Sequence, residues 1–499
     1  MKKILIFTFA TALSLLSSDL FIQKGHYSIT YDSLILPGNE KLGLLGTGYL
    51  YDFDHAYLGL GVYSAVSGQR GGFFTGGLEA GYKYTLGRNF SLDAGVFAGG
   101  GGGGSAPQGG GLMLRPHIAL LYTISGYKVG LGFSKVKFPN GNIDSNQVFL
   151  QLSIPFEAVH KKNTNSPMIL DDISDFMKST HTDMGWSDSY FAVTLQRYMI
   201  PGGVKNTSGN SMKKDMSLVG FEYGYELDKN LFLFGEAAGA AGGGTDGYAE
   251  VSGGIGYKKA FTRHFGVYAK ASLGAAGGGK VDTGGGVIHK EALGLYAKLN
   301  NKFSLGFEVG HIGAFDGNFK ATLLKFDFNY RLKSLSIGKN LQPLRSYQSF
   351  GDYEWNFEIS NQYYLGDKSI RKNSDASALS LIGFKIDKYL DKNFYISGQA
   401  LGAYSGHSGG YAVGLVGLGR RIPVGEKINL FAQMSIGVAG GGSVATGNGM
   451  IYQPMIGAEY KINNSFGVQT SFGKVKAIDG NLDTMAVDVG FSYKFRTIN

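Results

Sequence analysis

One arrangement of glycines occurs three times along the chain, and this repeat constrains the fold more than any other feature. In each copy a glycine-rich run is followed by a short Gly-Asn turn, and the three turns lie 176 and 163 residues apart. A period of this length is too long for a solenoid unit, so each repeat is the size of a domain. The runs are Gly99 to Gly104, Gly277 to Gly279 and Gly440 to Gly442, and the turns centre on Gly141, Gly317 and Gly480.

The composition differs from that of a soluble globular protein. Of 499 residues, 80 are Gly, 30 Tyr and 34 Phe, and only 17% are charged, against about 25% in soluble proteins. The chain has no Cys, which excludes disulfides and thiolate chemistry. Its formal charge of +9 comes from scattered basic residues, a pattern that does not indicate nucleic-acid binding.

The first 18 residues have the features of a secretory signal peptide. Lys2 and Lys3 precede an apolar stretch from Ile4 to Leu16, which is too short to span a bilayer. No later segment is apolar over the ~18 residues that a membrane helix needs. An exported chain of this composition is either a secreted β-protein or an outer-membrane barrel.

Most segments alternate apolar and small or polar residues with a period of two. In Phe303 to Val309 and Ile428 to Met434, for example, one face is apolar. The other face of the strands is mostly Gly, Ser, Asn or Gln, with an occasional Glu or Lys. This pattern, over about ten residues, is typical of a tilted membrane strand. Each repeat divides into eight strands, which in the first copy run near 20–31, 42–52, 56–65, 73–85, 89–98, 112–123, 127–136 and 147–157.

The connections between strands fall into two classes. The turns after the second, fourth and sixth strand of each repeat are tight, whereas the other loops are longer and contain the glycine runs. Outer-membrane barrels have short periplasmic turns and long outer loops. We therefore predict an all-β, antiparallel, up-and-down transmembrane β-barrel of about 24 strands, in the outer membrane of a Gram-negative bacterium. The glycine runs are then either flexible rim loops or places where the backbone closely approaches a ligand or neighbouring chain.

Twenty-four strands can close as one large barrel or as three eight-stranded barrels. Glycine on the inward face favours one large barrel, because a narrow barrel needs side chains to fill its interior. Long linkers favour three barrels. We expect the single large barrel, with three eight-stranded barrels as the alternative. The expected divisions are a signal peptide at 1–18, repeats at 19–157, 188–332 and 353–499, and linkers at 158–187 and 333–352.

The first linker is expected to hold a helix. Ser166 can cap it and Pro167 suits its first position. Such a helix could plug a shared lumen or pack beneath separate barrels.

The last strand resembles the β-signal that the barrel-assembly machinery recognises. The residues that carry the resemblance are Gly490, Tyr493 and Phe495. The resemblance implies the assembly machinery as a partner.

Two further sets of residues are candidates for function. Inward-facing polar residues would tune the selectivity of a pore. Basic residues on the lipid side at the outer rim would bind lipopolysaccharide phosphates. The first set is Glu79, Lys83, Arg115, Lys290, Glu308 and Gln453, and the second is Lys135, His311 and Lys474.

An eight-strand unit with a lipid-facing His near the end of its seventh strand resembles the lipid A deacylase barrels. That family pairs its His with a Ser two residues further on. Here Gly313 follows His311 at that spacing, and the other two copies have Lys135 and Lys474 in place of the His. No copy keeps the catalytic pattern, so deacylase activity is not expected.

The sequence therefore predicts an outer-membrane pore for passive passage of solutes or of a secreted polymer. The alternative is a structural or adhesive outer-membrane protein that displays its glycine-rich loops, and a lipid A-modifying enzyme is the third hypothesis. Outer-membrane lipid and lipopolysaccharide are expected partners. We expect no cofactor, metal or nucleic acid.

Overall fold

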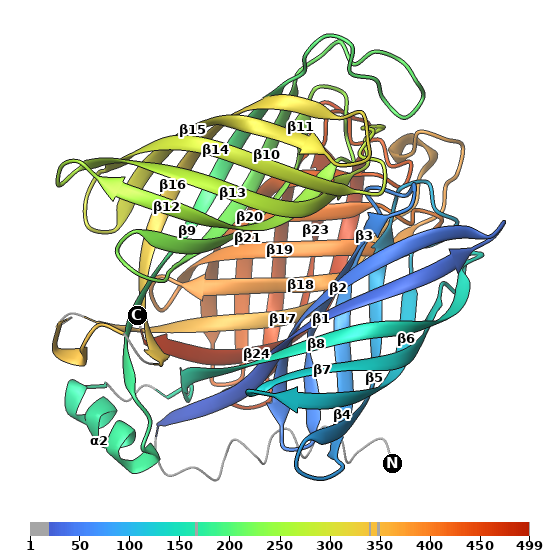
Figure 1. The fold of residues 1–499 in the computed structure, drawn as a ribbon. Helices are drawn as coiled ribbons and strands as arrows, with labels where there is room; N and C mark the ends of the chain where they lie inside the picture. The colour runs from blue at the N-terminus through green and yellow to red at the C-terminus, as the bar shows by residue number, and fades with distance from the viewer. Residues whose placement is uncertain (1–18, 165–167, 339–340, 347–349, 499) are drawn as a thin grey trace.

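The computed structural model describes residues 19–164, 168–338, 341–346 and 350–498, which form antiparallel strands almost throughout. Within these residues, twenty-four strands follow one another up and down (Figure 1). The predicted fold class, an all-β antiparallel barrel protein with 24 strands in three sets of eight, is confirmed.

Barrel 1 consists of β1 (Leu20–Leu36), β2 (Glu40–Phe53), β3 (Ala56–Ser67), β4 (Phe74–Thr85), β5 (Phe90–Gly102), β6 (Met113–Ile124), β7 (Tyr127–Lys137) and β8 (Asp144–Lys161). Barrel 2 consists of β9 (Met184–Met199), β10 (Met216–Glu226), β11 (Leu231–Gly242), β12 (Ala249–Ala260), β13 (Phe265–Gly277), β14 (Val287–Lys298), β15 (Phe303–Ala314) and β16 (Lys320–Ile337). Barrel 3 consists of β17 (Asp352–Tyr364), β18 (Leu379–Tyr389), β19 (Phe394–Ser405), β20 (Ala412–Val424), β21 (Ile428–Gly440), β22 (Met450–Lys461), β23 (Phe466–Ala477) and β24 (Asp483–Ile498). Short 3₁₀ turns, η1 (Leu344–Ser346) and η2 (Lys368–Ile370), precede and follow β17.

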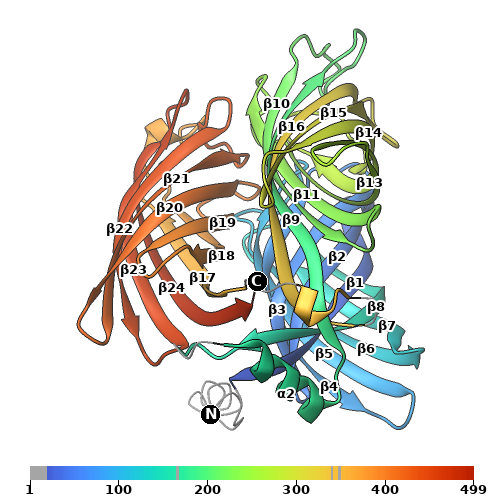
Figure 2. The same cartoon turned by 90° about the vertical axis from the view of Figure 1, so that its left-hand side faces the viewer.

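Each set of eight strands closes on itself. The first strand pairs with the last along its length in every barrel: β1 with β8, β9 with β16, and β17 with β24. In contrast, β24 meets β8 through the single pair Arg496↔Lys161. The expectation of one large barrel was therefore wrong, and the alternative of three eight-stranded barrels is correct (Figure 2).

The inward glycines do not leave voids, which is why that expectation failed. A ring from the third strand of each barrel lies against a glycine of the fourth. A Cβ on Gly81 would lie 2.3 Å from the Tyr57 ring. The equivalent distances are 2.1 Å from Gly256 to Phe232 and 2.1 Å from Gly419 to Tyr395. Large and small residues thus interlock, and a narrow barrel is filled although it is rich in glycine.

The three barrels contact one another in a ring. β3 of barrel 1 lies against β13 and β14 of barrel 2, β11 of barrel 2 lies against β21 and β22 of barrel 3, and β19 of barrel 3 lies against β5 of barrel 1. The third strand of each barrel therefore meets the fifth strand, or the fifth and sixth, of the next. The three barrels of the chain therefore contact one another in cyclic order.

The glycine runs lie where the barrels of this ring touch. The amide of Gly410 in barrel 3 donates to Gly101 of the first run at 3.0 Å. A Cβ on Gly277 of the second run would lie 2.4 Å from the backbone nitrogen of Gly72 in barrel 1. At the third junction, Lys372 forms an ion pair with Asp246. Of the two interpretations of these runs, the structure shows close approach of neighbouring backbones.

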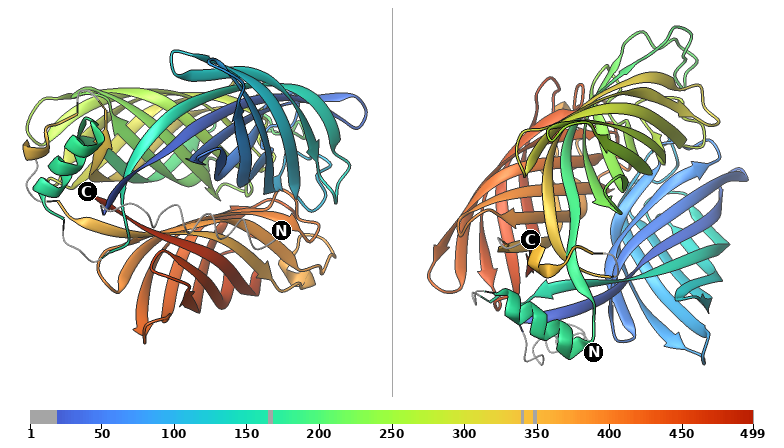
Figure 3. Two further views of the ribbon diagram at one scale, coloured as in Figure 1. Left: turned by 90° about the horizontal axis from the view of Figure 1, so that it is seen from below. Right: turned by 60° about the vertical axis from the view of Figure 1, so that its left-hand side comes forward.

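Helix α2 (Leu170–Thr180) lies outside all three barrels, near the short-turn end (Figures 2 and 3). Its Ile173 is buried in an apolar cluster with Leu20, Trp186 and Ile498, which come from three different barrels. The helix therefore joins the barrels at their base and does not plug a lumen.

The linker around α2 is shorter than the expected range of 158–187, because β8 continues to Lys161 and β9 begins at Met184. The helix begins at Leu170, where the Asp172 carboxylate accepts the amide hydrogen of Ile169 at 3.0 Å. The expected cap residues Ser166 and Pro167 lie outside the described residues.

The outward faces of the strands carry exposed apolar side chains. Phe133 of barrel 1 is 69% exposed, Leu293 of barrel 2 is 71% exposed and Leu418 of barrel 3 is 64% exposed. Among the described residues, no helix has the length and apolar character to cross a membrane.

Two tight turns are held by an aspartate that caps the following backbone amides. Asp391 accepts hydrogen bonds from the amides of Asn393 and Phe394, both at 2.7 Å. Asp228 does the same for Asn230 and Leu231 at 2.7 and 2.8 Å. These hydrogen bonds stabilise the carboxylate form and lower the pKa of each aspartate below its usual value.

This capping predicts an acid-sensitive contribution to stability. Because the folded-state pKa is lowered, the stabilisation is complete above the ordinary Asp pKa of about 3.9 and is lost as the pH falls through the lowered value. We expect the Asp228→Asn/Asp391→Asn variant to lose less stability between pH 5 and pH 2 than the unmodified protein. Denaturant unfolding at several pH values measures this. Identical pH profiles would contradict the assignment. Asn463, which makes the equivalent bonds at 2.8 Å without titrating, shows that the amide can hold such a turn.

Candidate functional site: the charged lumen and basic vestibule of barrel 2

A chain of ion pairs runs across the interior of barrel 2. Lys325 pairs with Glu222 at 2.5 Å and also with Glu236. Lys270 pairs with Glu222 and with Glu308, both at 2.7 Å. Lys290 continues the chain, from Glu236 at 2.5 Å to Glu250. Strands β10 to β16 each contribute one of these seven side chains, and each side chain is at most 7% exposed.

Strand alternation places these charges inside. Lys325, for example, lies between Leu324 and Phe326 in β16, and Phe326 is 42% exposed on the outer face. Burying a charge is costly unless it is paired, and here each lysine lies between two carboxylates. The pairs link strands on different sides of the barrel, so they fill and close the lumen.

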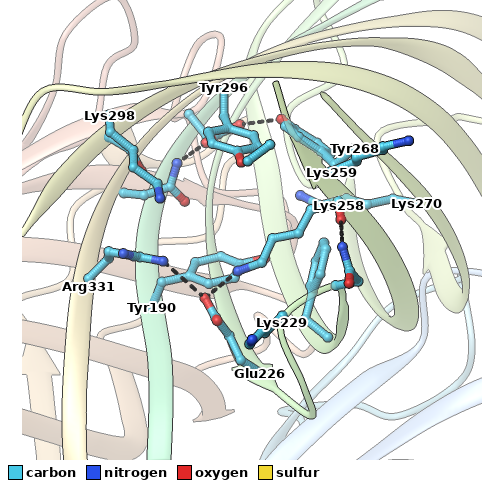
Figure 4. Close-up of a pocket in the computed structure, with 16 residues that line it drawn as sticks. Tyr190, Glu226, Lys229, Lys258, Lys259, Tyr268, Lys270, Tyr296, Lys298 and Arg331 are labelled. Atoms are coloured by element: carbon cyan, nitrogen blue, oxygen red, sulfur yellow. Dashed lines mark hydrogen bonds and ion pairs between the residues drawn. The ribbon is translucent and has the colours of Figure 1, made fainter. Parts of the chain in front are cut away.

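At the short-turn end, the lumen of barrel 2 widens into a cavity of about 480 Å³ (Figure 4). We call this cavity the vestibule. Its acidic residues are Glu226 and Asp327, and Glu226 is bound by Lys258 at 2.5 Å and by Arg331 at 3.5 Å. Its basic residues are Lys229, Lys258, Lys259, Lys270, Lys298 and Arg331. Six basic and two acidic side chains give the vestibule a positive potential, which attracts anions.

The vestibule connects directly to the ion-pair chain, because Lys270 belongs to both. Beside it, the Tyr268 hydroxyl lies 3.1 Å from Glu308 and 3.2 Å from Asp327. An anion that entered the vestibule would therefore meet an ammonium group already shared by two glutamates.

All six residues expected on the inward face lie inside a barrel. In barrel 1, Arg115 is fully buried and pairs with Asp32 at 3.0 Å, and Lys83 lies 3.5 Å from Asp52. Glu79 is also buried there, and Gln453 is buried in barrel 3. The role of the six in selectivity stays a prediction. Two of them, Lys290 and Glu308, belong to the barrel 2 chain.

Sequence reasoning missed most of that chain. Its missed members are Glu222, Glu236, Glu250, Lys270 and Lys325. A signal was present, since each of these charges stands at an inward position of an alternating strand.

Barrels 1 and 3 are also filled by polar side chains. In barrel 1, the Tyr57 hydroxyl donates to Asp93 at 2.9 Å. In barrel 3, Lys385 pairs with Glu358 at 3.2 Å and Lys494 with Glu459 at 2.5 Å. Neither has an ion-pair chain as long as that of barrel 2 among the described residues.

The expected rim residues lie on the outward face near the long-loop end. Lys135 pairs with Asp144 at 2.8 Å, and Lys474 pairs with Asp483 at 2.7 Å. The His311 ring lies 5.9 Å from the ring of His289. Lipopolysaccharide binding by these residues stays a prediction.

The proposed assembly signal lies in the strand that closes barrel 3. In β24, the Tyr493 and Phe495 rings stack at 5.8 Å, and Gly490 pairs with Ser360 of β17. Recognition by the assembly machinery stays a prediction.

Neither a metal centre nor the deacylase pattern is found at these positions. In the described ranges, no group of three or more His, Asp or Glu side chains is arranged to hold a metal ion. Gly313 supplies no hydroxyl beside His311.

No family model matches this chain, and no curated protein matches it. Among solved structures it is similar to OccK11 (OpdR) of Pseudomonas aeruginosa, with 11% identity over 96% of this chain and 98% of that chain and a TM-score of 0.22. It is also similar to the KdgM porin, with 8% identity over 60% of this chain and 98% of that one and a TM-score of 0.15. A ferric enterobactin receptor of Pseudomonas aeruginosa matches with 9% identity, 96% and 82% coverage and a TM-score of 0.27. Likenesses with TM-scores this far below 0.5 carry no argument about function.

Proposed function

We propose that the protein is an outer-membrane channel of a Gram-negative bacterium, and that small anionic solutes enter barrel 2 through its vestibule. Closed barrels satisfy their backbone hydrogen bonds without water, as a membrane requires, and apolar side chains cover their outer faces. The short turns and the vestibule then face the periplasm. The observation that carries the proposal is the excess of basic over acidic side chains around an opening that leads into a charged lumen.

The ion-pair chain makes this a narrow, gated route. Lys325 and Lys290 each lie between two glutamates, so either lysine can strengthen one pair while it releases the other. Such an exchange would open a path along one side of the lumen. We therefore expect small and intermittent conductance, unlike the large conductance of a wide pore.

Charge reversal in the vestibule tests the proposal. In planar bilayers under a salt gradient, we expect the unmodified protein to have a reversal potential that favours anions. The Lys258→Glu/Arg331→Glu variant should shift this potential toward cation preference. The charged side chains at a channel mouth set the local concentration of anions and cations. Lys24→Glu, at an outward position whose side chain is 73% exposed, is the matched control and should leave the reversal potential unchanged.

Two outcomes would contradict the channel. One is no conductance in any recording, and the other is a reversal potential that the vestibule variant leaves unchanged. Lys258 and Arg331 both bind Glu226, so replacing both with glutamate places three carboxylates together. Adding Glu226→Gln to the variant removes one of these charges, so that the reversal potential can be measured even if the double variant does not fold.

A structural role is the second candidate function, and the filled lumens of barrels 1 and 3 favour it. Three closed barrels in one chain present a wide outer surface to lipid without needing a pore. This role predicts that deletion of the protein makes cells more sensitive to detergent, and that the purified protein shows no conductance in planar bilayers. We propose no catalytic function.

A further inference from the structure

The strand ladder is interrupted at one equivalent place in barrels 1 and 3. Between β6 and β7, the pair Leu114↔Lys137 is followed by His117↔Ser134, and the residues between them are unpaired. Between β22 and β23, the register skips in the same way from Tyr452↔Lys476 to Met455↔Gly473. Pro116 and Pro454 stand in the two gaps. Proline has no amide hydrogen to donate, so it breaks a ladder within a sheet.

Barrel 2 has no such break. Glu291 occupies the equivalent place and pairs with His311, and the ladder continues from Ile288↔Ala314 to Lys298↔Ser304. Barrel 2, whose wall is intact, can therefore be compared with barrels 1 and 3, which each have a proline gap.

A groove lies on the outward face at each gap. On barrel 1 it measures about 700 Å³ and is lined by Pro116, Ile118, Phe133 and Val148, with Lys135 among the lining residues. On barrel 3 it measures about 890 Å³, and its lining includes Pro454, Ile456, Phe472, Met485 and Lys474. Both grooves thus combine an apolar wall with a lysine close to the long-loop end.

The surface at this end of each groove has an excess of positive charge, from the lysine that lines the groove and a second lysine beside it. On barrel 1, Lys135 and Lys137 share the single carboxylate of Asp144, at 2.8 and 3.8 Å. On barrel 3, Lys474 and Lys476 share Asp483 at 2.7 and 3.6 Å. The side chains are 40–51% exposed. Two ammonium groups on one carboxylate retain the capacity to bind a phosphate.

Buried polar atoms lie behind both gaps. Ser134 and Gln147 line the barrel 1 groove and also bind Asp32, the partner of Arg115. Arg115 is fully buried, and its Nη1 has no hydrogen-bond partner. In barrel 3, the Oε1 atom of the buried Gln453, which precedes Pro454, also has none. The wall is therefore incompletely hydrogen-bonded at these two places.

We propose that the two grooves bind a phosphorylated, acylated lipid of the outer leaflet, with an acyl chain along the apolar wall and the phosphate on the lysine pair. The inference rests on the membrane setting of the proposed function, since it places the long-loop end in the outer leaflet. A lipid suits this site better than a soluble anion, because the groove walls are apolar and face outward.

Native mass spectrometry of the full chain in detergent tests the inference, with phosphorylated lipid A and its dephosphorylated form as probes. We expect two phosphorylated lipids to bind per chain, and the dephosphorylated form to bind at least about tenfold more weakly. Lys135→Gln/Lys137→Gln should remove one lipid, and adding Lys474→Gln/Lys476→Gln should remove the second. Lys24→Gln, which replaces an outward lysine with a 73% exposed side chain at the short-turn end of barrel 1, is the matched control and should leave the number at two.

A second pair of variants distinguishes the contribution of the groove's shape to lipid binding from that of its lysines. Pro116→Val and Pro454→Val restore an amide hydrogen at each gap and keep every lysine. They should weaken both probes, whereas the lysine variants weaken only the phosphorylated one. Undiminished binding to the four-lysine variant would overturn the inference, as would equal affinity for the two probes. Lipid binding without conductance would leave this inference standing and reject the channel alone.

Discussion

Replacing Gly72 with alanine is expected to separate barrel 1 from barrel 2. Gly72 has a φ of +85°, and a Cβ there would lie 2.2 Å from the backbone nitrogen of Gly278 in barrel 2. Backbone atoms cannot rotate away as the end of a side chain can, so one barrel must move. We expect about 1–2 kcal/mol of lost stability from the positive φ and about 1–3 kcal/mol more from the overlap.

Gly203→Ala is the matched control for this variant. Gly203 also has a positive φ, of +91°, but a Cβ there meets nothing within 4 Å. The control therefore carries the conformational cost without the contact. Equivalent substitutions at the other junctions should have smaller effects, because their distances are 2.8 Å from Gly247 to Gly441 and 3.0 Å from Gly410 to Gly103.

Denaturant unfolding in detergent gives the stability, and trypsin reports the junction itself. Arg70 is held by Glu40 at 2.6 Å and by the carbonyl oxygen of Ser105 at 2.7 Å. When Gly72→Ala displaces this loop, cleavage after Arg70 should become faster than in Gly203→Ala. Equal stability and equal cleavage in the two variants would mean that the barrels do not pack here.

The strands and turns could be predicted because they depend on local chemistry. Alternation with a period of two placed β7 at 127–136, against the observed Tyr127–Lys137. A tight turn such as that at Asp391 can be recognised from its own residues, since the capping carboxylate binds only the amides two and three residues further along the chain. Neither inference depends on distant parts of the chain.

Closure could not be predicted, because it depends on which distant strands pair. Inward glycines were expected to leave voids in a narrow barrel, but at Gly81 the Tyr57 ring occupies that space. The glycine runs posed the same difficulty, since the partner of Gly72 is Gly278, in another repeat. A glycine in a sequence shows where space is needed and does not show what occupies that space.

The site was predictable in part for the same reason. Strand parity placed Lys290 and Glu308 inside a barrel. It could not show that Glu236 lies beside Lys290, because they stand on strands β11 and β14, which do not pair in the sheet. The ion-pair chain is a property of the closed barrel.

Replacing Lys325 with methionine is expected to have the largest effect on barrel 2. Lys325 is 2% exposed and lies between Glu222 and Glu236. Methionine keeps the apolar stem and removes the charge, which leaves two buried carboxylates facing each other. Removing one partner of a buried ion pair costs about 3–5 kcal/mol. The urea midpoint of unfolding should therefore fall clearly.

Glu222→Gln is the matched control, and it should cost less. The cluster has four glutamates and three lysines, so removing a carboxylate brings it closer to neutrality, whereas removing Lys325 takes it further away. The double variant Lys325→Met/Glu222→Gln should recover part of the stability that Lys325→Met loses, because the two residues interact directly.

The same variants test whether the ion-pair chain controls conductance or only stabilises barrel 2. If the ion-pair chain closes a conducting lumen, Lys325→Met should lengthen the openings in planar bilayers. It should also shift preference toward cations, because four glutamates and only two lysines of the chain then line the path. Glu222→Gln should leave Lys325 paired with Glu236 and change the openings little. If the Lys325→Met protein is destabilised and shows no conductance, the ion-pair chain contributes to stability alone. If it is as stable as the unmodified protein, the buried ion-pair network itself is contradicted.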